Sequence, residues 1–377
     1  MKEYLYENKL RSEKTGKEYL FETSDGVSSK NSFRESELLL ADTVEPEIDD
    51  DILILYSGYG FLGILGDCAP EGNTVLMESS DSAYQISKHN IELNEIDDVK
   101  CRKVSSPGEL DGDFDKIIYA PQPYSPIDLV KNRISEAVGL LKDEGELFIC
   151  SGKKEGLNRY RDWLQEFEGK LGRVNHRDSY QVYRYKKEGD VEPEKKAIGK
   201  KFEVEVKGVK ASFEAVEGVF SPDKLDEGSR LLIENVEIEK GERIWDVGCG
   251  YGTIGIFLKK LYDCNIYLSD DDALSVELAE KNLRRNDIDF YNLENADCLD
   301  CYKDKRFDVI VTNPPTHQGK AVTDEIFQES YNRLKEGGRL YLVYNQNMSF
   351  ENQLREIFEE VNVLEEEDNY IVVEARR

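Results

Sequence analysis

The chain repeats its own sequence once, about 190 residues further along. The segment that begins at Phe21 recurs at Phe213, an offset of 213 − 21 = 192 residues. The same offset carries Asn90 onto Asn282. It also carries the glycine-rich segment 58–64 onto 250–256. A period this long indicates a duplicated domain, because repeats that stack into solenoids are much shorter.

A chain of 377 residues has room for two domains of ordinary size. Between the two copies lies a charged segment that contains Pro and Gly and few residues to bury. We therefore predict a first domain at 1–185, a linker at 186–200 and a second domain at 201–377.

In the second copy, apolar runs alternate with amphipathic stretches. The predicted strands are Arg243–Val247, Asn265–Ser269, Asp308–Thr312, Arg339–Tyr344, Val361–Leu364 and Tyr370–Glu374, and the predicted helices are Ile254–Tyr262, Ala273–Asn286, Val322–Leu334 and Phe350–Phe358. Alternating strands and helices predict an α/β fold with a mostly parallel, doubly wound sheet. The last two strands are too close for a helical crossover, so we expect an antiparallel pair at that end.

Glycines follow the first predicted strand, where a ligand can approach the backbone closely. The segment contains Asp246, Gly248, Cys249, Gly250 and Gly252. More acids follow the next two strands: Asp270 and Asp271 after the second, then Asp297, which Ala296 precedes. An acid at the end of the second strand accepts ribose hydroxyls. Acids and glycines without a phosphate cradle favour S-adenosylmethionine over a dinucleotide as the cofactor.

A turn of unusual chemistry, Asn313-Pro314-Pro315, follows the apolar strand Asp308–Thr312. Open α/β sheets bind ligands at the carboxyl ends of their strands. Proline fixes φ and has no N–H, so the carbonyl groups around it point in set directions. The turn is suited to holding a planar amino group while a group is transferred to its nitrogen.

Together these motifs resemble the class I S-adenosylmethionine-dependent methyltransferases. The tandem layout, the lead-in Gly218-Val-Phe220-Ser and the Asn313-Pro-Pro-Thr316-His317 segment are similar to those of ribosomal RNA guanine-N2 methyltransferases. The resemblance implies two Rossmann-like domains and methyl transfer to the N2 amine of a guanine, with small-subunit ribosomal RNA as the expected substrate. It further implies that the Asn313 side-chain oxygen and the Pro314 carbonyl accept hydrogen bonds from the target amine.

One position departs from that family. Residue 316 is Thr where the family has an aromatic residue, on which a flipped base would stack. His317 can take that role, with Phe220 and Tyr251 as alternatives. A histidine in a loop is equally often bonded only to backbone. We therefore expect catalytic roles for Asn313, Pro314, Pro315 and His317, and substrate contacts from Thr316, His317 and Phe220.

The first copy lacks several of these groups. Ile54 and Tyr56 stand in place of Asp246 and Gly248, Ser105 replaces Asp297, and Ala120 replaces Asn313. Glu78 keeps the place of the ribose acid. We expect this domain to lack catalysis and to serve substrate recognition. Its back half is locally basic, which indicates either an RNA-facing patch or a solvated face: Arg133, Lys153, Lys154, Arg159, Arg161, Arg173 and Arg177.

The net charge of −28 argues against passive binding of nucleic acid, unless the protein works in high salt. In molar salt the Debye length is about 3 Å, and repulsion from RNA is screened. A halophilic host is therefore one reading of the acidity. Methylation of a protein glutamine or an adenine amine, and a non-enzymatic RNA-binding or assembly role, remain alternatives.

No apolar run is long enough to cross a membrane, and the start does not resemble a signal peptide. We expect a cytoplasmic monomer with RNA as its partner. Seven scattered cysteines do not form a disulfide framework. The lone pair Cys298 and Cys301 lacks the further ligands of a zinc site, so we expect no metal.

Overall fold

The computed structural model describes residues 6–24, 27, 31–123, 125–189, 199–297, 301–315, 320–367 and 369–377. The chain forms two compact units, Met1–Ile198 and Gly199–Arg377, and we describe each by itself. Strand β9 (Tyr180–Lys187) runs two residues into the predicted linker, and β10 begins at Lys200. Residues 190–198 lie outside the described part.

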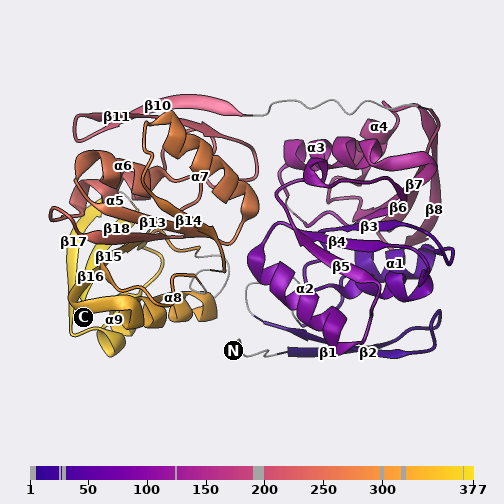
Figure 1. Ribbon diagram of the computed structural model, residues 1–377, viewed down its shortest axis with the longest axis horizontal. Coiled ribbons are helices and arrows are strands. Elements are labelled where there is room, and N and C mark those ends of the chain that lie inside the picture. The colour runs from indigo at the N-terminus through magenta and orange to yellow at the C-terminus, as the bar shows by residue number, and fades with distance from the viewer. Residues whose placement is uncertain are drawn as a thin grey trace. The chain divides into compact units, whose positions relative to one another are not determined.

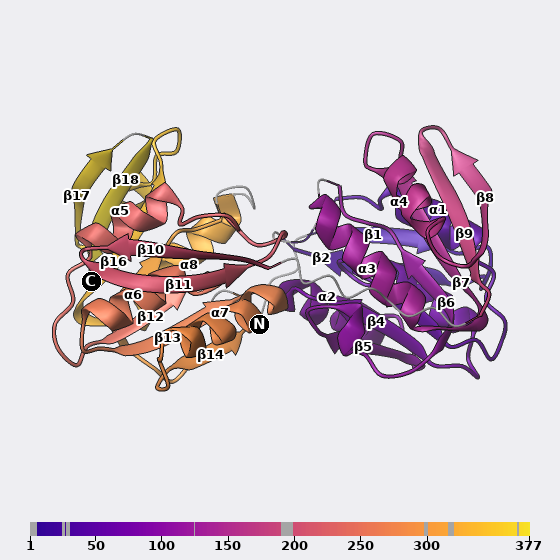
Figure 2. The ribbon, with the colours of Figure 1, turned by 90° about the horizontal axis from the view of Figure 1, so that it is seen from above.

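The second unit is a seven-stranded, mostly parallel sheet with helices on both faces (Figures 1 and 2). Its strand order is β14-β13-β12-β15-β16-β18-β17. From β12 the chain first adds β13 and β14 on one side and then β15 and β16 on the other. Such a change of side leaves a crevice at the carboxyl ends of the two adjacent parallel strands, β12 and β15. The strands are β12 (Arg243–Val247), β13 (Asn265–Asp270), β14 (Asn292–Asn295), β15 (Phe307–Thr312), β16 (Leu334–Asn345), β17 (Glu360–Glu367) and β18 (Tyr370–Arg376).

Two apolar clusters cover the two faces of this sheet. One joins α5 (Glu227–Asn235), α6 (Thr253–Leu261) and α7 (Ala273–Arg285) to the sheet and to a hairpin of β10 (Lys200–Val206) and β11 (Val209–Ala215). The other packs α8 (Lys320–Arg333) and α9 (Glu351–Ile357) against the opposite face. Burial on both faces explains why the central strands are continuous apolar runs.

The first unit has the same plan, with sheet order β5-β4-β3-β6-β7-β9-β8. A hairpin again precedes the sheet, and the last two strands are again antiparallel to their neighbours. Its elements are β1 (Tyr6–Arg11), β2 (Glu18–Thr23), α1 (Glu35–Thr43), β3 (Ile52–Leu55), η1 (Phe61–Cys68), β4 (Thr74–Glu78), α2 (Asp81–Leu93), β5 (Val99–Lys103), η2 (Pro107–Glu109), β6 (Phe114–Tyr119), α3 (Ile127–Gly139), β7 (Leu141–Gly152), α4 (Leu157–Leu164), β8 (Gly169–Arg177) and β9. The predicted duplication of a doubly wound fold is confirmed.

One asparagine lock is repeated in both units. In the second unit, Asn282 of α7 accepts from the Glu214 N–H at 2.7 Å and donates to the Glu214 and Tyr251 carbonyls at 2.9 and 3.0 Å. In the first, Asn90 of α2 accepts from the Glu22 N–H at 2.8 Å and donates to the Glu22 and Tyr59 carbonyls at 2.9 and 2.8 Å. An amide with one acceptor and two donor hydrogens can join three backbone groups at once. The lock ties each hairpin to the loop that follows the first sheet strand.

The predicted strands and helices of the second copy are all present, with shifted ends. The largest difference is β16, which begins at Leu334 instead of Arg339 and absorbs the predicted last residue of α8. Its pairing with β15 shifts register between Phe307 and Val309. Charged residues and glycines at 335–338 give this first stretch no strand pattern in the sequence. Among the described residues, no helix is long and apolar enough to span a membrane.

Candidate functional site

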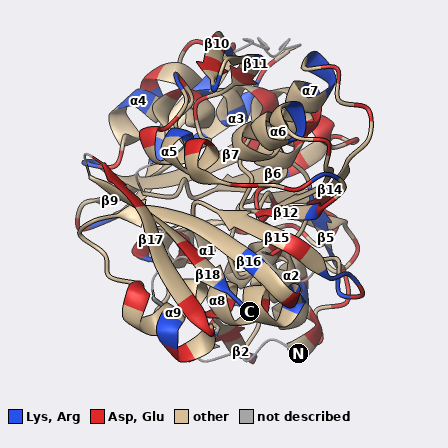
Figure 3. Cartoon of the chain, turned by 90° about the vertical axis from the view of Figure 1, so that its left-hand side faces the viewer, with Lys and Arg blue, Asp and Glu red and all other residues tan. Residues whose placement is uncertain are grey.

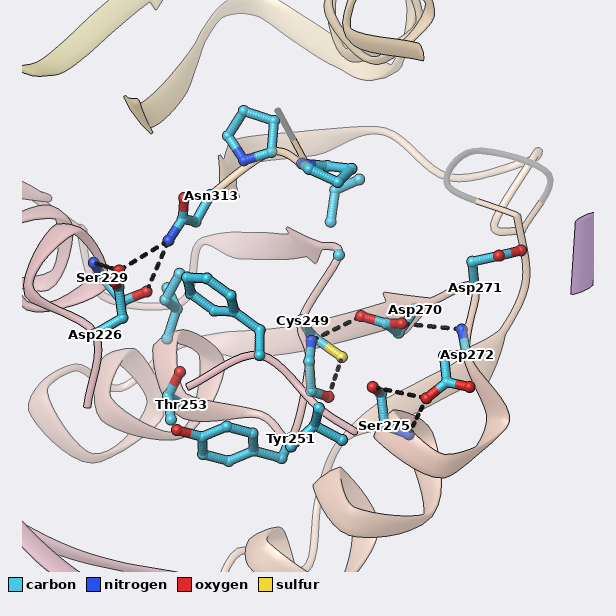
Figure 4. Close-up of a pocket in the computed structure, with 18 of the residues that line it drawn as sticks. Asp226, Ser229, Cys249, Tyr251, Thr253, Asp270, Asp271, Asp272, Ser275 and Asn313 are labelled. Atoms are coloured by element: carbon cyan, nitrogen blue, oxygen red, sulfur yellow. Dashed lines mark hydrogen bonds between the residues drawn. The ribbon is translucent and has the colours of Figure 1, made fainter. Parts of the chain in front are cut away.

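A pocket of about 530 Å³ opens at the carboxyl edge of the second sheet (Figure 4). Its walls come from the segments that follow β12, β13 and β15, from the end of β16, and from the start of α5 with the residues before it. Parallel strands bring these loops to one edge although they are distant in sequence. The lining includes Phe220, Asp226, Ser229, Gly248, Cys249, Gly250, Tyr251, Asp270, Asp271, Asp272, Ser275, Asn313, Pro314, Pro315, Tyr344, Asn345 and Tyr370.

The floor of the pocket is the glycine loop between β12 and α6. Gly248, Gly250 and Gly252 have φ values of 69°, 54° and 92°, a region that side chains with a Cβ rarely adopt. A Cβ added at Gly248 or Gly250 would meet nothing within 4 Å, so it would project into open space. The loop therefore leaves room for a ligand to lie directly on its backbone.

Asp270, at the end of β13, holds this loop in place. Its Oδ2 accepts from the Gly250 N–H at 2.8 Å and its Oδ1 from the Asp272 N–H at 3.0 Å (Figure 4). Each carboxylate oxygen has a second lone pair, so the group can still accept hydroxyl donors from a ligand. Burial raises the pKa of Asp270 to about 7, against the opposing effect of the Asp272 and Gly250 N–H groups.

Asp246 lies beneath the loop and not on the pocket wall. It is buried, with 1% of its surface exposed, and its Oδ2 accepts from the Gly255 N–H in α6 at 2.8 Å. Its Oδ1 is buried and has no hydrogen-bond partner within the described residues. Burial raises the pKa of this carboxyl to about 7. In this geometry Asp246 fixes the start of α6 and does not line the pocket.

The Asn313 side chain enters the pocket from the end of β15. Its Nδ2 donates to Asp226 Oδ2 at 3.1 Å and to Ser229 Oγ at 3.0 Å (Figure 4). No described donor bonds to its Oδ1, which is left as an acceptor for a ligand. Pro314 and Pro315 continue the same wall.

Phe220 borders the pocket on a loop before α5, and 58% of its surface is exposed. The loop is held by the Tyr251 hydroxyl, which donates to the Ser221 carbonyl at 2.9 Å. Ser221 has a φ of 50°, a conformation that costs a non-glycine residue free energy. A tethered loop with an exposed ring can offer an aromatic face to a ligand.

The pattern of the methyltransferase small domain family matches this chain twice, over residues 18–184 and 210–374. The chain belongs to the methyltransferase small domain family. A Bacillus subtilis protein described as uncharacterized protein YbxB is 36% identical over 174 residues, which are 44% of this chain and 86% of that protein. Ribosomal RNA large subunit methyltransferase G of Shewanella halifaxensis is 26% identical over 90% of this chain and 82% of its own length. The match to the Shewanella woodyi protein of the same name covers 41% of that protein.

Among solved structures, the 16S rRNA N2 G1207 methyltransferase of T. thermophilus, in complex with AdoMet and guanosine, superposes with a TM-score of 0.83. The two sequences are 25% identical, and the match covers 98% of each chain. The tandem methyltransferase fold inferred from the sequence is thus confirmed. The protein is an S-adenosylmethionine-dependent methyltransferase.

The pocket fits that cofactor on its own geometry. The open space above Gly248 and Gly250 is where a Cβ would otherwise stand, and the Asp270 carboxylate faces it from the end of β13. No cluster of three or more His, Cys, Asp or Glu side chains that could hold a metal ion occurs within the described ranges. Cys298 lies outside them.

Most of the residues predicted for the methyltransferase site meet in this pocket. Phe220, Gly248, Cys249, Gly250, Asp270, Asp271, Asn313, Pro314 and Pro315 line it, whereas Asp246, Gly252, Ala296 and Asp297 do not. Thr316 and His317 lie outside the described residues. Sequence reasoning assigned no role to Asp226, Ser229 or Tyr370. The signal for Asp226 was present, because Asp directly before an amphipathic run is a typical helix N-cap.

The corresponding region of the first unit carries bulkier side chains. Tyr56, at the place of Gly248, adopts a φ of 55°, and the Arg133 guanidinium carbon lies 3.7 Å from the centre of its ring. Glu78 accepts from the Gly58 N–H at 2.7 Å, just as Asp270 accepts from Gly250. Unlike Asp270, Glu78 lines no described pocket and is 3% exposed, and burial raises its pKa to about 8. The frame of the methyltransferase loop persists in the first unit, but a tyrosine packed against Arg133 stands at the place of Gly248.

Proposed function

We propose that this methyltransferase modifies the exocyclic N2 amine of a guanine in ribosomal RNA, with small-subunit rRNA as the first candidate. The observation that carries the proposal is the Asn313 amide, which is anchored through its nitrogen and leaves its oxygen as an acceptor in the pocket. The likeness to the T. thermophilus enzyme over 98% of both chains supports guanine and the small subunit. The large-subunit names of the Shewanella relatives make large-subunit rRNA the competing substrate.

Methyl transfer to such an amine requires the protein mainly to align the amine nitrogen with the methyl group. The lone pair of an aromatic amine is delocalised into the ring, so the amine is a weak nucleophile. When bound, S-adenosylmethionine supplies an electrophilic methyl group, whose bond electrons remain on sulfur as the new N–C bond forms. Asn313 Oδ1 and the Pro314 carbonyl would accept from the two amine hydrogens and aim the nitrogen, a positioning effect. Neither acceptor is basic enough to retain the released proton, which passes to water.

Phe220 is our candidate for the ring on which the flipped base stacks. It borders the pocket, is more than half exposed, and lies on a loop that Tyr251 tethers. Stacking of a base on an aromatic side chain contributes roughly 1–3 kcal/mol. Such a contact would compensate for Thr316, which cannot stack.

We assign substrate recognition, without cofactor binding, to the first unit. Its basic surface is smaller than the sequence indicated. Arg133 is buried against Tyr56, so it cannot face RNA, and Arg177 pairs with Asp42 at 2.7 Å. Four exposed cations of the set make no ion pair with described residues: Lys153, Lys154, Arg159 and Arg173.

Acidic residues are spread over the outer elements of the second unit, as along β17 in Figure 3. We therefore expect that added salt does not simply weaken the affinity for RNA. Added salt weakens the attraction of the few cations to phosphate and also screens the repulsion by the carboxylates. A protein with this charge should tolerate or require high salt for activity on RNA.

Mass spectrometry of nucleosides tests the proposal in cells that contain or lack the protein. Small-subunit and large-subunit rRNA are isolated separately and digested. Loss of N2-methylguanosine from small-subunit rRNA supports the proposal, and loss from large-subunit rRNA moves the target to the other subunit. Unchanged N2-methylguanosine together with loss of an N6-methyladenosine would contradict it.

A further inference from the structure

The Asn313 side chain could present either of two chemically opposite ends to the pocket. An asparagine amide carries an acceptor oxygen on one side and a donor NH₂ on the other, with nearly the same shape. If the oxygen faces a substrate, the site favours an amine. If the NH₂ faces it, the site favours a carbonyl or hydroxyl oxygen. The proposed function requires the first arrangement.

Asp226 decides between these two arrangements. Its Oδ2 lies 3.1 Å from Asn313 Nδ2. An ionised carboxylate can only accept hydrogen bonds, so the amide must turn its NH₂ toward Asp226. A rotated amide would bring its oxygen against the carboxylate, with two acceptors and no proton between them. The Ser229 hydroxyl, 3.0 Å from the same nitrogen, could bond to either end and so does not discriminate.

Asp226 is itself fixed by contacts from two other elements. It is the N-cap of α5, where its Oδ2 accepts from the Ser229 N–H at 2.8 Å. Its Oδ1 accepts from the Tyr370 hydroxyl of β18 at 3.3 Å. Both oxygens therefore have partners, and the carboxylate cannot rotate away from Asn313 without losing bonds. Figure 4 shows Asn313 turned toward Asp226 and Ser229.

The first unit lacks all three of the residues that form this arrangement, Asp226, Ser229 and Asn313. At the offset of 192 residues, Arg34 replaces Asp226 and Glu37 replaces Ser229. Ala120 directly follows β6 as Asn313 directly follows β15, so it stands in place of Asn313. Arg34 makes no N-cap hydrogen bond, and its guanidinium instead donates to the Ala120 carbonyl at 2.7 Å. Helix α1 begins without the acidic cap that α5 retains. The restraining acid is therefore absent in the same copy that lacks the amide.

We propose that Asp226 is a positioning residue that sets the specificity of the site, by keeping the acceptor end of Asn313 toward the substrate. The site thereby takes a donor amine in preference to an oxygen nucleophile. This inference rests on the proposed function, because it names what makes the same pocket selective for an amine. Asp226 acts through Asn313 and requires no contact with the reacting atoms.

Two substitutions separate this role from helix capping. Asp226→Ser keeps a good N-cap side chain but is too short to bond to Asn313. Asp226→Asn keeps an oxygen acceptor at the original distance. Ser80→Ala, which removes the N-cap of α2 in the first unit, is the matched control for loss of a cap alone. For each variant we would measure kcat, the cofactor Kd by calorimetry and the melting temperature.

Asp226→Ser should lower kcat on the order of 10- to 100-fold, as expected for a misaligned reactive group, while the cofactor Kd stays within about threefold. Asp226→Asn should recover most of that loss, and Ser80→Ala should leave kcat unchanged. A kcat for Asp226→Ser within about threefold of the wild type would overturn the proposal. So would an equal loss in the two Asp226 variants.

An activity-independent measurement keeps the proposal testable if the wild type methylates no RNA. In protein labelled with ¹⁵N-asparagine, the side-chain NH₂ signals of Asn313 are assigned by their loss in Asn313→Ala. We expect these signals to move in Asp226→Ser and to stay in place in Ser80→Ala. Unmoved signals in Asp226→Ser would refute the proposed role of Asp226 in orienting Asn313. An inactive wild type whose signals do move in Asp226→Ser would refute only the proposed function.

Discussion

The repeated asparagine lock allows the same substitution to be made beside the candidate cofactor site and in the corresponding place of the first unit. Asn282 and Asn90 each make three hydrogen bonds to backbone groups, and neither side chain is exposed. The two differ in what lies beyond the lock. Asn282 holds the Tyr251 carbonyl, which is part of the glycine loop under the pocket. Asn90 holds the Tyr59 carbonyl in the first unit.

The expected cost follows from the bonds removed. A typical hydrogen bond contributes a net amount of about 1 kcal/mol, so replacing either Asn by Ala should lower the stability of its unit by about 3 kcal/mol. The buried groups left without partners push the cost upward. The effect on cofactor affinity should be unequal, because only Asn282 supports a loop that a ligand contacts.

Differential scanning calorimetry resolves the unfolding of the two units, since a chain with two units need not unfold in one step. We expect each variant to lower the transition of its own unit. Calorimetric titration should then show weaker cofactor binding for Asn282→Ala and unchanged binding for Asn90→Ala. Equal weakening of cofactor affinity by both variants would refute the assignment of the cofactor to the second unit. A loss of stability well below 1 kcal/mol in both would refute the energetic reasoning.

Four further predictions concern the cofactor site. Calorimetric titration of the wild type should give one S-adenosylmethionine per chain, and two equal sites would contradict the account of the first unit. Gly250→Ala should weaken cofactor binding, because the added Cβ projects into the pocket. The substitution also places a residue with a Cβ at a φ of 54°, which costs a conformational free energy of about 1–2 kcal/mol. An affinity equal to that of the wild type would argue that the cofactor does not approach this backbone. Asp270 should ionise near pH 7. Cofactor affinity should therefore rise between pH 6 and pH 8, because the carboxylate that accepts the ribose hydroxyls forms over this range. The dependence of affinity on pH should be flatter in Asp270→Asn. Because folding raises the pKa of Asp270, this carboxyl binds more protons in the folded than in the unfolded protein above pH 4, so its contribution to stability without cofactor should fall as the pH rises toward 7. The stability of Asp270→Asn should therefore fall less than that of the wild type over this range, and an equal or steeper fall would contradict the raised pKa.

Much of the fold and part of the site could be predicted from the sequence. The duplication, the apolar strands and the glycine loop leave local signals, and the positions of Asp270 and Asn313 at strand ends place both residues at one edge of the sheet. Local signals could not show that Asp246 turns beneath the loop, because that depends on how α6 docks. Nor could they show that Arg133 is buried against Tyr56, since a basic residue in a helix usually faces solvent.

The contacts that orient Asn313 were beyond sequence reasoning for a related reason. Asp226 is 87 residues from Asn313, and Tyr370 is 144 residues from Asp226. Only the order of strands, with β18 inserted beside β16, brings Tyr370 to the same end of the sheet. The sequence pointed to the amide of Asn313 but not to Asp226, and the fold brings the two side chains together.

The most direct test of the central claim is methyl transfer in vitro, followed by nucleoside mass spectrometry of the RNA. Purified wild-type protein and Asn313→Ala are each incubated with S-adenosylmethionine and with small-subunit rRNA, free or in particles, that lacks the modification. Asn235→Ala, at the far end of α5, serves as a control for loss of an asparagine outside the pocket. The account predicts N2-methylguanosine with the wild type and with the control, and a rate lower by a factor on the order of 100 to 1,000 with Asn313→Ala, while its cofactor affinity is retained. Undiminished transfer by Asn313→Ala, or a methylated nucleoside other than N2-methylguanosine, would contradict it.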